Sequence, residues 1–138
     1  MIAGLGIDLI EVARFEREVA RHGDGVINEL FTPSEIVACR RARDPFPAYA
    51  IRFAAKEALF KALGTGKVGR MAWSNIEVAW PGGQARASMT LTGETAAVAE
   101  EMGVTALHAS LACTRTLAVA WVVVAGADAR RESVVSSQ

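Results

Sequence analysis

The sequence contains few cysteines, no long apolar run and no excess of either charge. Cys39 and Cys113 are its only cysteines and lack C-x-x-C spacing, which argues against a disulfide scaffold and against a zinc site. No apolar run reaches the length of a membrane span, and the N-terminus shows no basic leader, so we expect no membrane anchor and no signal peptide. Acidic and basic residues number 15 each, which predicts no nucleic-acid and no membrane partner. These features together are typical of a cytoplasmic protein.

The length and the order of the patterns predict one α+β domain. A chain of 138 residues, 51% of them hydrophobic, can bury a core in a single domain. We place this domain at residues 1–125 and predict a flexible tail at 126–138, where small and polar residues dominate. The expected architecture is an antiparallel sheet packed against helices, with one long central helix.

Apolar periodicity and turn residues place the individual elements. We expect a buried strand at 2–10, further strands at 105–112 and 117–125, a hairpin at 75–80 and 85–91, and helices at 11–22, 24–30, 32–43 and 94–102. Thr32 and Glu35 form the pattern of a capping box. The prolines at 45 and 47 should separate the preceding helix from the central one. Residues 118–124 are apolar on both faces, which predicts a central strand or a subunit contact.

The central helix occupies most of the stretch from Arg52 to Gly66. An apolar stripe at helical spacing runs along one side, and Gly64 stands where a left-handed C-cap is expected. The opposite side mixes aromatic rings with charge, in Phe53, Lys56, Glu57, Phe60 and Lys61. A solvent-exposed helix face would carry charged residues without aromatic ones, so we expect both sides of this helix to contact other groups.

Three of these features, the Glu57–Lys61 pair, the glycine turn and Asp8, also have structural explanations. Glu57 and Lys61 are four residues apart and could form a surface salt bridge. The Gly64-Thr65-Gly66 turn offers backbone N–H groups to phosphate, but capping alone explains Gly64. Asp8 lies in a strand between apolar neighbours, where a carboxylate needs a partner or a metal, or caps the next helix.

Three arginines lie on one face of the helix at 11–22. Arg14, Arg17 and Arg21 have helical spacing and lie opposite the apolar face. A solvated face is one interpretation. The other is a docking surface for an acidic partner, because guanidinium binds carboxylate in bidentate fashion.

Two motifs together resemble the signature of the 4′-phosphopantetheinyl transferases, in particular the small holo-[acyl-carrier-protein] synthase type. The first is Phe53-Ala54-Ala55-Lys56-Glu57-Ala58, followed by Lys61 and Gly64-Thr65-Gly66. The second is Gly6-Ile7-Asp8 followed by Arg14. Both motifs stand in the expected order, and the resemblance covers roughly residues 1–125.

The resemblance implies an activity and a role for each matching residue. It implies transfer of 4′-phosphopantetheine from coenzyme A to a serine of apo-acyl carrier protein, with release of adenosine 3′,5′-bisphosphate. Asp8 and Glu57 would hold Mg²⁺, Lys61 would reach a phosphate with help from Lys56, and Glu57 is a candidate proton acceptor. Gly64, Thr65 and Gly66 would line the coenzyme path.

The resemblance also implies a homotrimer with its site between subunits, and a docking role for the arginines at 14, 17 and 21 toward acyl carrier protein.

The sequence departs from the family near its end. His108-Ala109-Ser110-Leu111 fits the family pattern, but Ala112-Cys113 stands where a Ser-His pair is usual. We interpret His108 either as a contact to the coenzyme or as a structural residue. We interpret Cys113 as a small buried residue. Two alternatives remain, a carrier-binding module with a lapsed site and a general nucleotide-binding protein.

Overall fold

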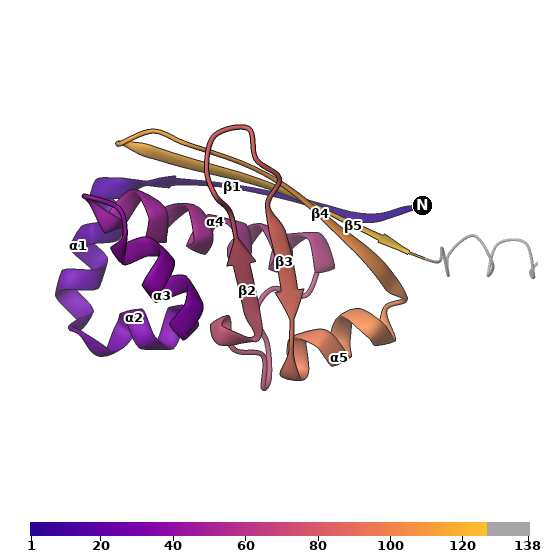
Figure 1. Ribbon diagram of the computed structural model, residues 1–138. Helices are drawn as coiled ribbons and strands as arrows, with labels where there is room; N and C mark the ends of the chain where they lie inside the picture. The colour runs from indigo at the N-terminus through magenta and orange to yellow at the C-terminus, as the bar shows by residue number, and fades with distance from the viewer. Residues whose placement is uncertain (127–138) are drawn as a thin grey trace, which may run out of the picture.

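The computed structural model describes residues 1–126 and confirms the predicted α+β fold with a long central helix (Figure 1). Its elements in chain order are β1 (Ile2–Glu11), α1 (Val12–His22), α2 (Gly25–Leu30), α3 (Pro33–Arg40), α4 (Pro45–Leu63), the 3-10 helix η1 (Trp73–Asn75), β2 (Ile76–Ala79), β3 (Ser88–Leu91), α5 (Gly93–Glu101), β4 (Val104–Cys113) and β5 (Leu117–Gly126). Gly126, predicted to start the tail, is the last residue of β5, and the rest of the predicted tail lies outside the described residues.

The strands form two antiparallel sheets. The larger sheet has the order β1-β5-β4, and β2 pairs with β3 as the predicted hairpin. The apolar strand at 118–124 is indeed the central one, because β5 pairs on both edges. β3 begins only at Ser88, so the hairpin is shorter than predicted.

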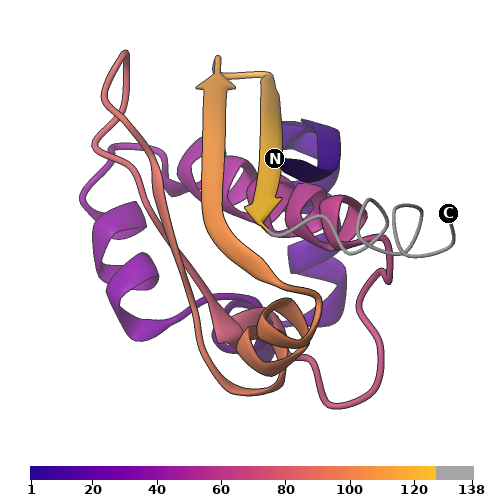
Figure 2. The ribbon, with the colours of Figure 1, turned by 90° about the vertical axis from the view of Figure 1, so that its right-hand side faces the viewer.

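Helix α4 lies along one face of the larger sheet, with α1, α2 and α3 gathered toward one end and α5 toward the other (Figures 1 and 2). Asp44 caps α4 by accepting the Phe46 N–H at 3.1 Å, and Pro45 occupies the first helical position. The two prolines therefore lie inside the first turn and do not precede the helix as predicted. Proline is tolerated there because the first turn leaves its N–H groups without helical partners.

Close contact between β1 and α4 depends on glycine. A Cβ atom on Gly6 would lie 1.9 Å from the carbonyl oxygen of Ala58, and one on Gly4 would lie 1.9 Å from that of Ala62. On the helix side, Ala54, Ala55, Ala58 and Leu59 are fully buried. Small residues on both elements thus bring the two backbones together, and the charged end of β1 comes close to α4.

The other face of the larger sheet is open, so the prediction of a buried first strand is wrong for half of its side chains. Leu5, Ile7 and Leu9 of β1 are 54%, 53% and 61% exposed. Ile7 pairs with Trp121 of β5, which is 48% exposed. Among residues 1–126 no helix covers this face (Figure 1). Within the same range, no helix combines the length and hydropathy needed to cross a membrane.

Candidate active site

Asp8 and Glu57 line one cavity of about 720 Å³, between the end of β1 and helices α1, α2 and α4. Asp8 stands next to apolar Leu9 and Ile10 in the strand, and Glu57 comes from the middle of α4. Phe15, Phe53 and other apolar side chains form much of the wall. Two carboxylates that lie 49 positions apart in the sequence therefore meet at one site within a single chain.

Lys61 forms its ion pair with Asp8 and not with its helical neighbour Glu57. The Nζ of Lys61 donates to Oδ1 of Asp8 at 2.9 Å and to the carbonyl of Ile7 at 3.2 Å. The Asp8 side chain is only 16% exposed, whereas that of Lys61 is 54% exposed. Because the Lys61 side chain is more than half exposed, its ammonium group can turn to an anionic ligand without disturbing the packing of the core.

The pKa of Glu57 is raised by burial first and by the nearby charge of Asp8 second, with Lys61 acting in the opposite direction. A carboxylate whose ionisation is disfavoured by burial and by a second carboxylate nearby is typical of a site that takes up a proton or a cation. Their oxygen donors are the ligands that Mg²⁺ prefers, and one or two protein carboxylates are common for this ion.

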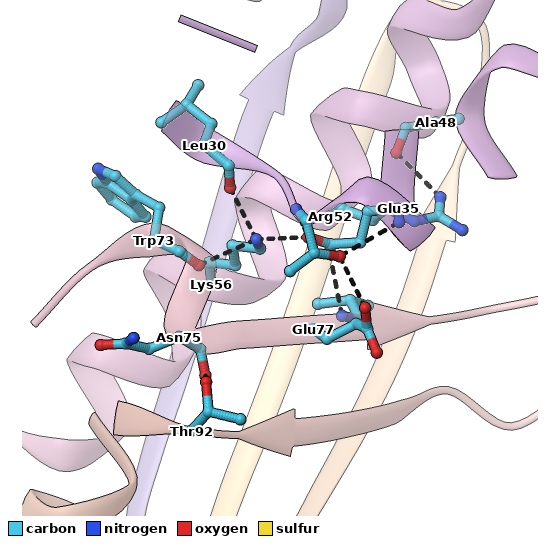
Figure 3. A network of polar contacts seen from close by, with 11 residues as sticks. Leu30, Glu35, Ala48, Arg52, Lys56, Trp73, Asn75, Glu77 and Thr92 are labelled. Atoms are coloured by element: carbon cyan, nitrogen blue, oxygen red, sulfur yellow. Dashed lines mark hydrogen bonds and ion pairs between the residues drawn. The ribbon is translucent and has the colours of Figure 1, made fainter. Parts of the chain in front are cut away.

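Lys56 does not line this cavity. Its side chain points into the protein interior, toward Glu35 and the backbone of Leu30 and Trp73 (Figure 3). Its Nζ donates to Glu35 Oε1 at 2.7 Å, to the Leu30 carbonyl at 2.7 Å and to the Trp73 carbonyl at 3.0 Å. The side chain has no exposed surface. All three N–H donors of the ammonium are thus engaged, and the expected assistance of Lys56 to a phosphate is wrong.

The glycine turn after α4 is at the surface. Gly64 has φ +77° and forms the predicted left-handed C-cap, with Gly66 also at positive φ (+65°). The Thr65 hydroxyl donates to the Gly66 carbonyl at 2.9 Å. Capping accounts for Gly64, while the exposed backbone around Thr65 stays open to the predicted contact with coenzyme.

Comparison with known proteins decides the family. Residues 4–120 match the model of the 4′-phosphopantetheinyl transferase superfamily. The chain belongs to this superfamily. It is 41% identical over 124 residues to the holo-[acyl-carrier-protein] synthase of Koribacter versatilis, covering 89% of this chain and 98% of that protein. The predicted resemblance is therefore confirmed, and the chain is an enzyme of the holo-[acyl-carrier-protein] synthase type.

Solved structures agree with this assignment. The holo-[acyl-carrier-protein] synthase of Neisseria meningitidis is 29% identical and superposes with a TM-score of 0.81, over 91% of this chain and 99% of that one. The Helicobacter pylori synthase, solved in complex with coenzyme A, is 31% identical with a TM-score of 0.72, over 88% of this chain and 99% of that one.

His108 and Cys113 lie apart from the two carboxylates in this chain. His108 is exposed on β4 and pairs with Val123, one position out of phase with the side chains that face α4. It therefore belongs to the open face of the sheet, opposite Asp8. Cys113 ends β4 and is exposed, so its interpretation as a small buried residue is wrong.

The three arginines of the synthase-type chain lie on the outer surface of α1. Arg14, Arg17 and Arg21 are all exposed. Arg14 also lines the cavity that holds Asp8 and Glu57. Arg21 pairs with Glu18 at 3.6 Å, so Arg14 and Arg17 are better placed to meet an acidic partner.

Sequence reasoning gave no role to Arg52, although it is almost as buried as Lys56. A signal was present, because Arg52 lies three residues before Ala55 and seven before Leu59, on the side of the apolar stripe. The sequence also did not predict the aromatic contacts of Phe53. Its ring centroid lies 5.5 Å from that of Phe15 and 4.9 Å from that of Trp73. These rings join the cavity wall to the segment that follows the glycine turn.

Proposed function

We propose that this enzyme transfers 4′-phosphopantetheine from coenzyme A to a serine of apo-acyl carrier protein and releases adenosine 3′,5′-bisphosphate in a Mg²⁺-dependent reaction. The observation that carries the proposal is the meeting of Asp8 and Glu57 in one cavity, with Lys61 at 2.9 Å from Asp8. The relatives named as holo-[acyl-carrier-protein] synthases support the same reaction.

Asp8 and Glu57 fit a magnesium site. Burial and the nearby charge of Asp8 raise the pKa of Glu57, so a divalent cation bound between the two carboxylates would stabilise the ionised form of Glu57. Among residues 1–126 no cluster of three or more His, Cys, Asp or Glu side chains suits a metal, so water and substrate phosphate would complete the shell, as is usual for Mg²⁺. When bound, the ion supplies positive charge that neutralises the phosphates and the leaving group.

The protein's own groups position the reactants. In the transfer, the serine oxygen bonds to the β-phosphorus of coenzyme A, and the bond from that phosphorus to the bridging oxygen breaks. Glu57, with its raised pKa, is our candidate to accept the serine proton. Lys61 would turn its exposed ammonium to a phosphate oxygen, and the backbone of Gly64, Thr65 and Gly66 would line the coenzyme path.

Subunit assembly is the second part of the proposal. The open sheet face exposes Leu5, Ile7, Leu9 and Trp121, and a contiguous apolar surface of this kind marks a contact with another protein. We propose that a second copy of the chain covers it and that three copies assemble, the number coming from the family resemblance. His108 lies on the same face, which would let it reach the coenzyme at a neighbour's site.

Carrier docking and location complete the proposal. Arg14 and Arg17 would bind an acidic surface of acyl carrier protein, placing its serine at the cavity that Arg14 lines. Cys39 and Cys113 are both free thiols, which is consistent with the reducing cytoplasm.

The test is a mass measurement on the carrier. The protein is incubated with coenzyme A, Mg²⁺ and apo-acyl carrier protein, and we expect the carrier to gain the mass of one phosphopantetheine. Asp8→Asn and Glu57→Gln should abolish the gain while the circular dichroism spectrum stays unchanged. No mass gain on any of several carriers would favour a carrier-binding module, and full activity in both variants would reject the metal assignment.

A further inference from the structure

The cavity that holds Asp8 and Glu57 carries more negative charge than these two residues supply. Glu11 at the end of β1 and Glu18 of α1 also line it, and Arg14 is the one lysine or arginine among the lining residues that the structure describes. The proposed Mg²⁺ would offset the charges of Asp8 and Glu57, and Glu18 has no part in that ion site. An acidic partner that approaches the cavity therefore meets like charge at Glu18.

Helical spacing explains why Glu18 faces the cavity while the arginines of α1 face outward. At about 100° per residue, Glu18 lies about 40° from Arg14 around the helix axis, on the side of the buried Phe15. Arg17 and Arg21 lie on the other side of Arg14 by the same count. The Glu18 side chain is 50% exposed, so its carboxylate stands at the solvent edge between the arginines and the cavity.

Glu18 also reduces the charge that α1 offers to a partner. Its Oε1 lies 3.6 Å from Nη1 of Arg21, and its Oε2 lies 3.5 Å from Nε2 of His22. None of the ion pairs formed within residues 1–126 includes Arg14 or Arg17. The basic face of α1 is thus divided, because Arg14 and Arg17 can bind carboxylates of a partner while Arg21 is already engaged by Glu18.

We propose that Glu18 determines which carrier proteins the enzyme accepts, by disfavouring a carrier that places a carboxylate opposite it. This role rests on the proposed docking of acyl carrier protein to α1. The favoured carrier presents acidic residues to Arg14 and Arg17 and a neutral or basic residue to Glu18. Like charges that face each other across an interface oppose binding and reject wrong partners, so a carrier that is acidic over its whole docking surface binds less tightly.

Neutralising Glu18 tests this role. The carrier KM of the full chain and of Glu18→Gln is measured at low salt and saturating coenzyme A, with an apo-acyl carrier protein whose surface is acidic throughout. We expect Glu18→Gln to lower this KM roughly two- to fivefold, the range that one exposed charge pair contributes, because a repulsion is removed and Arg21 is released. The decrease should shrink at high salt. Glu16→Gln makes the same charge change on α1, at an exposed residue that does not line the cavity, and as the matched control should lower the KM much less.

A double variant separates the repulsion from the release of Arg21. In Glu18→Gln/Arg21→Gln the decrease in carrier KM should persist in part, because the carboxylate at position 18 is removed there too. Its complete loss would assign the whole effect to Arg21 and overturn the proposal that Glu18 itself faces the carrier.

Variants of the carrier locate the contact. Each acidic surface residue of the carrier is changed in turn to lysine. With the unmodified enzyme most of these changes should raise the KM, because they remove partners of Arg14 and Arg17, and at least one should lower it, because it faces Glu18. That gain should disappear in Glu18→Gln. A carrier KM in Glu18→Gln that is unchanged, higher, or altered no more than in Glu16→Gln would overturn the proposal.

A binding measurement distinguishes failure of this proposal from failure of the proposed function. If no carrier gains phosphopantetheine, the transfer reaction is rejected, and calorimetric titration of the same carrier into the chain without coenzyme A still tests Glu18. Tighter carrier binding by Glu18→Gln than by Glu16→Gln would support its role. Equal dissociation constants for these variants, or no carrier binding at all, would overturn it.

Discussion

The Nζ atom of Lys56 lies 2.7 Å from Oε1 of Glu35, and neither side chain is exposed beyond 1%. Glu35 also accepts the backbone N–H groups of Thr32 at 2.9 Å and Val78 at 3.0 Å. This one ion pair therefore joins α4 to the start of α3 and to β2. Lys56 directly precedes Glu57 in the family motif. The ion pair therefore anchors in the core the same helical turn that presents Glu57 to the candidate site.

We predict that removing both partners costs less than the sum of the two single losses. Lys56→Met or Glu35→Gln should each lower the free energy of unfolding by roughly 3–5 kcal/mol, because the remaining charge stays buried without its partner. The double variant should lose clearly less than the sum, which urea denaturation of all four proteins would measure. Strictly additive losses would show that the two charges are not coupled.

A second prediction concerns the glycine contact beneath Asp8. Gly6→Ala would place its Cβ 1.9 Å from the Ala58 carbonyl oxygen, and because that atom is backbone, β1 must move. We expect a loss of at least about 2 kcal/mol in unfolding free energy and a fall in transfer rate, since β1 carries Asp8. Gly25→Ala, where a Cβ meets no atom within 4 Å, is the matched control and should leave both quantities nearly unchanged. A fully active and stable Gly6→Ala protein would contradict the close packing.

The third prediction follows from the raised pKa of Glu57 and applies to metal-free protein in EDTA. A carboxyl group with a raised pKa binds more protons in the folded than in the unfolded state, so stability falls as pH rises from the ordinary glutamate pKa of 4.5 through the higher pKa of the folded protein. Thermal unfolding of Glu57→Gln should show a weaker decline over that range. Asp8→Asn should weaken it in part, because Asp8 is the second cause of the shift. Equal pH profiles for all three proteins would show that this pair does not couple to folding.

Several features of the fold were predictable because a local signal decides them. The capping box of Thr32 and Glu35, the left-handed Gly64 and the apolar central strand each depend on residues adjacent in sequence. The first turn of α4 was misplaced because proline serves both as a helix breaker and as a favoured first residue. Capping by Asp44 selects the second role here.

The candidate site was predictable only in part. The meeting of Asp8 and Glu57 came from the family resemblance, and the structure places both in one cavity. The direction of Lys56 was missed because its partner Glu35 lies 21 residues away in the sequence, and no periodicity relates the two. The open face of β1 was missed for a similar reason, since a strand that is apolar on both faces has the same sequence pattern whether one face is covered or both are.

The fourth prediction concerns that open face. Trp121→Glu should convert the proposed trimer into monomers, because a charge placed among Ile7 and its neighbours loses solvation on assembly. Sedimentation equilibrium would measure the mass. Val37→Glu is the matched control, because Val37 is also about half exposed (55%) but lies on α3, away from this face. A wild-type chain that stays monomeric at micromolar concentration would reject the assembly outright, and a trimeric Trp121→Glu would place the contact elsewhere.

The fifth prediction separates docking from catalysis on α1. Reversing Arg14 and Arg17 to Glu should raise the KM for acyl carrier protein by about tenfold and leave the KM for coenzyme A nearly unchanged, because the lost contacts are with the carrier. The dependence of carrier KM on salt should also flatten, since screening then has less attraction to remove. Arg86→Glu, an exposed arginine in the segment between β2 and β3, makes the same type of charge change away from α1 and should leave both constants unchanged. An unaltered carrier KM in the Arg14 and Arg17 variants would assign that helix face to solvent.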